Sequence, residues 1–164
     1  APTIAGIAFN SDEAKLTVIG VPDTPGIAYQ ILGPIGDANI EVDVILQNVG
    51  DEGKTDFTFT VSRSDLEKAE AILESHIAEL GALEWRSDSR IAKVSLVGVG
   101  MRSHAGVAAN MFKALAEVGV NIQMISTSEI KISVIIEEKF LELAIRTLHS
   151  AFGLDQPEAG EAQD

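Results

Sequence analysis

The 164-residue sequence predicts an α+β fold of two tandem units, each with the element order βαββαβ. Three observations predict this fold: an internal repeat offset by about 80 residues, β-branched runs that alternate with amphipathic segments, and one strand missing from the second unit. The order βαββαβ is typical of a ferredoxin-like unit, which is a four-stranded antiparallel sheet with both helices on one face. We expect the other face and the edges of each sheet to be open for pairing.

The repeat is clearest where each unit begins. Residues 15–21 (KLTVIGV) recur as residues 93–99 (KVSLVGV), and both runs are short and β-branched, as expected of strands. A glycine-containing turn follows each run, at residues 22–26 and at residues 100–106. Each turn leads into a predicted helix whose apolar positions share one face: Ile27, Ile31, Leu32 and Ile35 in the first copy, and Val107, Met111, Phe112 and Leu115 in the second. This pattern indicates a tandem duplication.

The first unit continues with predicted strands near residues 41–49 and 54–61, and it ends with a strand at residues 82–86. Before the last strand, Ser64 stands three residues ahead of Glu67, which is the spacing of a capping box at a helix N-terminus. An apolar stripe predicts the helix that follows: Leu66, Ala69, Ile72, Leu73, His76, Ile77 and Leu80.

The second unit lacks its last strand. It has predicted strands near residues 122–126 and 130–136, and a helix from about residue 138 to residue 152. Residues 153–160 (GLDQPEAG) cannot supply the strand that should follow, because their composition is unfavourable in a sheet. Neither unit uses the apolar run at residues 3–9 (TIAGIAF), so we predict that this run completes the second sheet.

This pairing predicts that the first unit is inserted into the second. The first domain is then expected to span residues 11–90, and the second to combine residues 1–10 with residues 91–154. Residues 155–164 are expected to form a disordered acidic tail.

The composition argues against several classes of protein. Asp and Glu number 25 against 12 Lys and Arg, and a net charge of −13 disfavours nucleic acid, whose phosphates require clustered cations. Only 5% of the residues are aromatic, which disfavours RNA binding by base stacking. The absence of cysteine excludes disulfides and thiolate metal sites. No apolar run reaches the roughly 20 residues of a membrane span, and the first residues do not resemble a secretory signal, so we expect a cytoplasmic protein that does not contact membranes.

No catalytic residues and no metal ligands are predicted. His76 and His149 lie in predicted helices without a partner at metal-binding spacing, and His104 is expected to be a turn or packing residue. The GVGMRS run at residues 98–103 resembles the dinucleotide-binding fingerprint but lacks its third glycine. A small enzyme is an alternative that turnover of a phosphoryl or acyl substrate would support.

The strand-to-helix turn of the first unit is a stronger candidate for a ligand site. Gly26 opens the predicted helix, whose unpaired N–H groups and positive dipole end favour a carboxylate. Asp23 in the turn and Gln47 on the next strand can accept hydrogen bonds from an ammonium group. Together these groups suit a free α-amino acid. The simpler alternative is an ordinary turn in which Asp23 caps the helix.

Five segments closely resemble the regulatory part of aspartate kinase, which consists of two tandem ACT domains. They are residues 21–26 (VPDTPG), 47–49 (QNV), 55–59 (TDFTF), 91–107 (IAKVSLVGVGMRSHAGV) and 121–134 (NIQMISTSEIKISV). The resemblance covers nearly the whole chain except the acidic tail, and it is most specific at STSEIKISV. In some bacteria this part is also made as a separate β subunit, and family members place one ACT domain as an insertion in the other.

The resemblance implies regulation rather than catalysis. Aspartate kinase phosphorylates the side-chain carboxylate of L-aspartate, the first committed step towards lysine, threonine, methionine and diaminopimelate. Its kinase region, which uses ATP and Mg²⁺, precedes the ACT pair. The chain is therefore expected to use no cofactor and to bind L-threonine and/or L-lysine as feedback inhibitors. The implied partners are a second copy of the chain, paired through the ACT domains, and a catalytic subunit in an α2β2 assembly. A free-standing ACT-domain sensor of another enzyme is the alternative.

Two effector sites are also implied by the resemblance. The threonine-type site matches Asp23, Gly26, Ala28, Gln47, Asn121 and Ile122. The lysine-type site matches Asp43, Ser103, His104, Ser128 and Glu129. Asp43 and Glu129 offer carboxylates for the lysine side chain. The sequence departs from some relatives in its short loop at residues 50–53, where substitutions could change the effector that is sensed.

Overall fold

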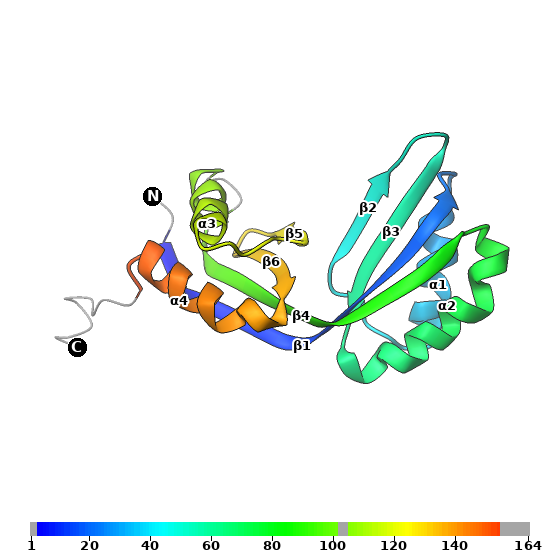
Figure 1. The fold of residues 1–164 in the computed structure, drawn as a ribbon, viewed down its shortest axis with the longest axis horizontal. Coiled ribbons are helices and arrows are strands. Elements are labelled where there is room, and N and C mark those ends of the chain that lie inside the picture. The colour runs from blue at the N-terminus through cyan, green and yellow to red at the C-terminus, as the bar shows by residue number, and fades with distance from the viewer. Residues whose placement is uncertain (1–2, 102–104, 155–164) are drawn as a thin grey trace. The chain divides into compact units, whose positions relative to one another are not determined.

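The computed structural model describes residues 3–101 and 105–154, which contain six β-strands and four α-helices (Figure 1). In chain order the elements are β1 (Thr3–Pro22), α1 (Ile27–Asp37), β2 (Ile45–Val49), β3 (Lys54–Val61), α2 (Leu66–Leu80), β4 (Glu84–Val99), α3 (Ala105–Glu117), β5 (Met124–Thr127), β6 (Lys131–Glu137) and α4 (Leu141–Ala151). Short 3-10 helices at Arg63–Asp65 and Glu138–Phe140 precede α2 and α4. None of the helices in these ranges is long and apolar enough to cross a membrane. The predicted tail at residues 155–164 lies outside the described residues.

Contacts between residues divide the chain into two compact units. The inserted unit runs from Asp12 to Ile91, and the split unit combines the residues up to Ser11 with those from Ala92 onwards. The strand order is β2-β3-β1-β4 in the inserted unit and β1-β4-β6-β5 in the split unit. The long strands β1 and β4 each contribute to both units. The predicted fold class, α+β with one unit inserted into the other, is therefore confirmed.

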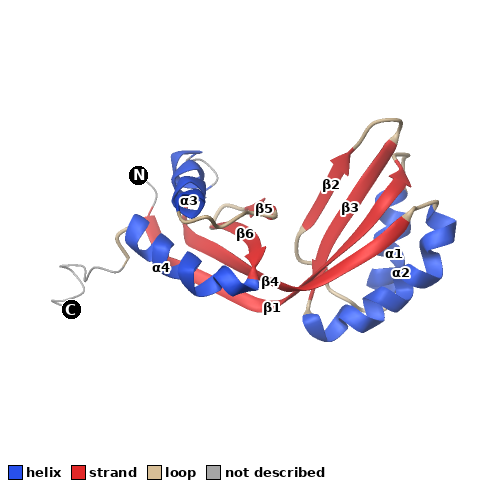
Figure 2. Ribbon diagram, in the orientation of Figure 1, coloured by secondary structure: helices blue, strands red, loops and turns tan. Residues whose placement is uncertain are grey.

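Each unit pairs its strands and helices as the pattern predicts. In the inserted unit β3 is antiparallel to β1 and to β2, and in the split unit β5 is antiparallel to β6. Helix α1 packs beside α2, and α3 packs beside α4. Figure 2 shows α1 and α2 on the same face of the sheet of the inserted unit. The opposite face of that sheet carries polar residues, among them Thr17 and Thr58, whose hydroxyls are 3.0 Å apart.

The core of the inserted unit lies between its sheet and its helices. Residues that alternate along β1 and β3 are buried, and α1 and α2 add apolar side chains on the predicted stripes: Leu16, Val18, Phe57, Phe59, Ile31, Ile35, Ala69 and Leu73. His76, which the stripe also included, is only partly buried, and its Nδ1 lies 2.8 Å from the carbonyl oxygen of Ile72.

A second, separate core fills the split unit. It is built from the repeats of the same positions: Leu96, Val107, Met111, Leu115, Ile132, Val134, Ala144 and Leu148. Ile4 and Ile7 of the N-terminal run pack against this core, as expected if that run completes the second sheet. The buried hydroxyls of Ser95 and Ser133 lie 2.7 Å apart and form a hydrogen bond with each other. This bond offsets the free-energy cost of removing the two hydroxyls from water.

Three details of the predicted strands are wrong. The runs at residues 3–9 and 15–21 belong to one continuous strand, β1, because the polar residues between them stay extended instead of turning. In the same way, the strands predicted at the end of one unit and the start of the next are both parts of β4. Residues 41–44 precede β2 rather than belonging to it. There the N–H of Asp43 bonds the carbonyl of Thr60, and the N–H of Val44 bonds the Thr60 hydroxyl.

The predicted capping box at Ser64 is also wrong. Helix α2 follows directly on the 3-10 helix Arg63–Asp65, and neither helix has a side-chain cap. The Ser64 hydroxyl instead lies 3.0 Å from the hydroxyl of Ser62. The preceding 3-10 turn extends the helical path, so that Ser64 stands inside this path and not at its start.

Candidate functional site

The turn between β1 and α1 presents an open helix N-terminus. Gly26 occupies the N-cap position with φ 91°, a left-handed conformation that a side chain would strain. The N–H of Ile27 bonds the carbonyl of Thr24 at 3.2 Å. No side chain of residues 3–101 or 105–154 caps the helix. The N–H groups of the first turn therefore point outward with the positive end of the helix dipole, an arrangement that suits a small anion.

Asp23 stands directly before this helix end. Its side chain is exposed and makes no hydrogen bond or ion pair with any residue in the described part of the chain. The hypothesis that Asp23 is a helix cap is therefore wrong. Its own N–H bonds the carbonyl of Gly53 at 2.8 Å, so the backbone is fixed while the carboxylate remains available to a ligand.

Two residues that are not among the predicted site residues, Gly53 and Asp56, support the turn. Gly53 lies in the β2–β3 loop and accepts the bond from Asp23. Asp56 Oδ1 accepts a hydrogen bond of 2.9 Å from the N–H of Gly20, which has φ 68° and lies where the pairing of β1 with β3 becomes irregular. Both bonds join segments that are far apart in the sequence, so no local pattern could have revealed them.

Gln47 lies on the edge strand β2, on the helix-covered face of the sheet. It stands opposite Phe57, which in turn stands opposite Val18, and opposed residues in antiparallel strands point to the same face. Phe57 and Val18 belong to the core, so Gln47 projects on the side of α1 and remains exposed. The structure thus places Asp23, Gly26, Ala28 and Gln47 on one unit, with Asp23 and Gly26 in the turn and Ala28 at the start of α1.

Asp43 does not belong to this group. It precedes β2, and its N–H bonds Thr60, near the end of β3 that is opposite to the Asp23 turn. The lysine-type residue Asp43 is therefore separated along the sheet from the threonine-type residues of the same unit.

The other site residues belong to the split unit. Asn121 is exposed and Ile122 packs partly against the split-unit core. Ser128 Oγ accepts a hydrogen bond of 3.2 Å from the N–H of Lys131, and the carbonyl of Glu129 accepts one of 3.0 Å from Met101. This last bond repeats the Asp23–Gly53 bond of the inserted unit. Ser103 and His104 lie outside the described residues.

The arrangement is suited to binding rather than to reaction. In residues 3–101 and 105–154, no group of three or more potential ligands lies close enough to hold a metal ion. The turn offers backbone N–H donors and a carboxylate, and β2 of the same unit carries the amide of Gln47. These are recognition groups for a molecule with both an anionic and a cationic end.

Comparison with known proteins identifies both units. Models described as ACT domain match residues 15–78 and 94–152, one in each unit. Aspartate kinase of Pseudomonas putida is 66% identical over 95% of this chain, which spans only 38% of the length of that protein. A crystal structure of aspartokinase alpha and beta subunits contains a chain that is 56% identical, with 92% of this chain and 99% of that one covered and a TM-score of 0.87. The ligand-free regulatory subunit of aspartate kinase from Thermus thermophilus is 42% identical, with 91% and 98% covered and a TM-score of 0.87. The chain belongs to the family of aspartate kinase regulatory subunits, which are built from two ACT domains.

Proposed function

We propose that the chain senses L-threonine, L-lysine or both, and that it passes this signal to aspartate kinase as feedback inhibition. The observation that carries the proposal is the exposed carboxylate of Asp23 beside the uncapped N-terminus of α1. The α-carboxylate of the amino acid accepts hydrogen bonds from the N–H groups of the first turn, Ala28 among them. The ammonium group donates to Asp23 and to Gln47. Residues of the split unit, Asn121 and Ile122, complete the threonine-type site.

A lysine-type site is proposed at Asp43, Ser128 and Glu129, with Ser103 and His104 from the segment between β4 and α3. The two carboxylates suit the ammonium group at the end of a lysine side chain. Asp43 belongs to the inserted unit and the other residues to the split unit, as in the threonine-type site. Both proposed sites therefore need residues of two ACT domains, in one chain or in two copies.

Inhibition follows from linkage between binding and conformation. An effector shifts the enzyme towards its inhibited state only by the difference between its affinities for the two states. Allosteric couplings are typically about 1–3 kcal/mol, which is a change in affinity of roughly 5- to 150-fold. A site that combines two ACT domains supplies such a difference, because its affinity depends on how the domains meet.

Replacing Gln47 by alanine is expected to weaken threonine binding by about fivefold, since a neutral hydrogen bond contributes about 1 kcal/mol. Isothermal titration of the purified chain with L-threonine and with L-lysine measures this change. Asn48→Ala is the matched control, because Asn48 stands opposite Asp56 on the other face of the sheet. Equal losses in both variants, or none in either, would contradict the site. A wild-type chain that binds neither amino acid would overturn the proposed function.

The proposed partners are a second copy of the chain and a catalytic aspartate kinase subunit. The crystallised alpha and beta subunits of a close relative support the second partner. In this proposal the kinase region of that enzyme uses ATP and Mg²⁺, and this chain binds no cofactor. The proposed location of the assembly is the cytoplasm. Co-purification with a kinase subunit would support this assembly. Its absence would favour a free-standing sensor.

The edge strand β2 is the proposed contact between copies. All five of its residues are exposed, and Ile45, Leu46 and Val49 form an apolar edge whose backbone groups can pair with another strand. Leu46→Lys is expected to shift the chain from dimer to monomer in light scattering, because a charge on an edge strand opposes pairing. Ser75→Lys, on the exposed surface of α2, should leave the mass unchanged. A Leu46→Lys variant that remains dimeric would place the contact elsewhere.

A further inference from the structure

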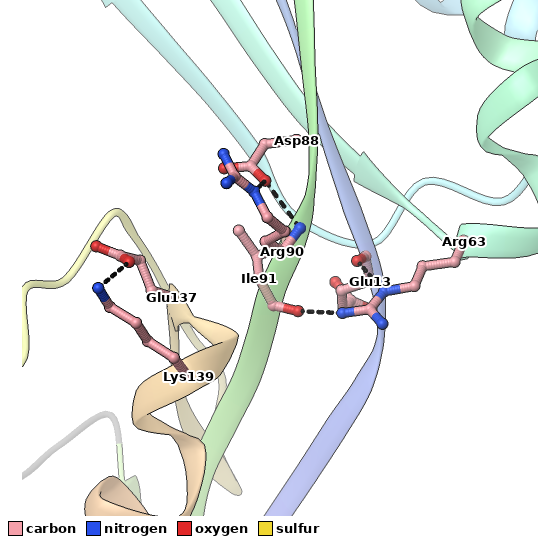
Figure 3. Close-up of polar contacts among 7 residues, drawn as sticks. All are labelled: Glu13, Arg63, Asp88, Arg90, Ile91, Glu137 and Lys139. Carbon is pink, nitrogen blue, oxygen red and sulfur yellow. Dashed lines mark hydrogen bonds and ion pairs between the residues drawn. The ribbon is translucent and has the colours of Figure 1, made fainter.

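Arg63 joins the two strands that connect the inserted unit to the rest of the chain. Its Nε donates a hydrogen bond of 3.1 Å to the carbonyl of Glu13 on β1. Its Nη2 donates one of 2.9 Å to the carbonyl of Ile91 on β4 (Figure 3). One side chain from the turn before α2 thus bonds the backbones of both strands.

The turn itself is tied to the same place. Asp12 accepts a hydrogen bond of 2.7 Å from the hydroxyl of Ser62 and one of 2.9 Å from the N–H of Arg63. We name these five residues, Asp12, Glu13, Ser62, Arg63 and Ile91, the Arg63 clasp. Its members on β1 and β4 include the first and last residues of the inserted unit, Asp12 and Ile91. Both strands continue from the clasp into the split unit.

Burial and chemistry make this contact stronger than the surface ion pairs of the same unit. Glu13 is 3% exposed and Ile91 is fully buried, so the clasp bonds lie against a covered part of both strands. The guanidinium is a planar fork whose donors have fixed directions, so that one group can hold two carbonyls at once. By contrast, Arg90 pairs with the nearby Asp88 and with no other carboxylate of the described residues, and its side chain is 89% exposed.

We propose that Arg63 is a positioning residue for effector binding, because it fixes β1 and β4 where they leave the inserted ACT domain. This inference rests on the proposed function, in which both effector sites combine residues from the two domains. A site shared between domains binds tightly only if the strands that connect them hold a defined geometry. Without the clasp, part of the binding free energy is spent on ordering these strands.

The test compares three variants of the full chain: Arg63→Gln, Arg63→Lys and, as a matched control, Arg90→Gln. Because the chain has no cysteine, Glu79→Cys on α2 and Glu117→Cys on α3 introduce one spin label in each unit. Pulsed electron-spin resonance, with labelled chain diluted into unlabelled chain, gives the distribution of distances between the labels. Isothermal titration of the unlabelled variants gives the affinity for L-threonine, and the fluorescence of Trp85 shows that the inserted unit is folded.

We expect Arg63→Gln to broaden the distance distribution and to weaken threonine binding by at least about fivefold, the lower end of typical allosteric couplings. Arg63→Lys keeps the charge but cannot hold both carbonyls in the fork geometry. Its distance distribution and its affinity for threonine should therefore lie between those of Arg63→Gln and those of the wild type. Arg90→Gln should match the wild type in both.

Two outcomes overturn the inference while leaving the proposed function intact. One is an unchanged distance distribution in folded Arg63→Gln. The other is a broadened distribution with unchanged threonine affinity, in a protein whose affinity falls when Asp23 is replaced. Failure of the proposed function looks different, since the wild-type chain then binds no threonine at all, and the inference about effector binding is overturned with it.

Discussion

Replacing Asp23 by alanine is expected to weaken threonine binding by about 10- to 150-fold. Hydrogen bonds to charged groups contribute about 1.5–3 kcal/mol, and about 1.4 kcal/mol is a factor of ten in affinity. The carboxylate makes no hydrogen bond or ion pair with any residue of the described ranges. If the proposed site is correct, its loss therefore removes an interaction with the ligand and none with those residues. The backbone bond from Asp23 to Gly53 is retained in the variant. Isothermal titration measures the affinity.

Asp37→Ala is the matched control for this experiment, because Asp37 is an exposed carboxylate on the last turn of the same helix. It should bind threonine like the wild type. The free energy of unfolding should change by no more than about 0.5 kcal/mol in either variant, as is usual for surface substitutions. A similar loss of affinity in both variants would show a general effect of net charge rather than a site at the turn.

The parts of the fold that follow from periodicity could be predicted from the sequence. Short β-branched runs such as residues 15–21 predicted strands, and the surplus run at residues 3–9 predicted the insertion, because a sheet with a missing strand needs one from elsewhere. The capping box failed at Ser64, since its spacing does not reveal that a 3-10 turn comes first. The continuity of β1 was missed because a polar segment at residues 10–14 can be a turn or an extended connection.

The candidate site could likewise be predicted only in part. Turn chemistry alone pointed to Asp23 and Gly26, and strand placement pointed to Gln47. The bonds that Asp56 and Gly53 make could not be predicted, because they join segments 36 and 30 residues apart and depend on the register of β1 against β3. Asp43 and Glu129 came from the family resemblance only, and their role is a proposal. The role of Arg63 could not be predicted for the same reason, because its partners Glu13 and Ile91 are far from it in the sequence.

Replacing Phe59 by alanine is expected to lower the free energy of unfolding of the inserted unit by about 3–5 kcal/mol. Phe59 is fully buried on the central strand β3, opposite both Leu16 and Ile45. Its ring centroid lies 6.4 Å from that of Phe57 at a tilt of 54°, a favourable aromatic geometry that alanine also removes. The cavity would lie between β1 and the edge strand that carries Gln47, so threonine binding should weaken together with stability.

Urea unfolding followed by the fluorescence of Trp85 measures this loss. Trp85 is the single tryptophan of the chain, it packs against the core of the inserted unit, and its Nε1 bonds Glu74 at 2.5 Å. It therefore reports on the unit that contains Phe59. Phe9→Ala is the control, because Phe9 is 60% exposed and its removal should cost less than about 0.5 kcal/mol. A free energy of unfolding of Phe59→Ala within about 1 kcal/mol of the wild-type value would contradict this prediction. It would mean that neighbouring side chains fill the space left by the ring, which close packing of the protein interior opposes.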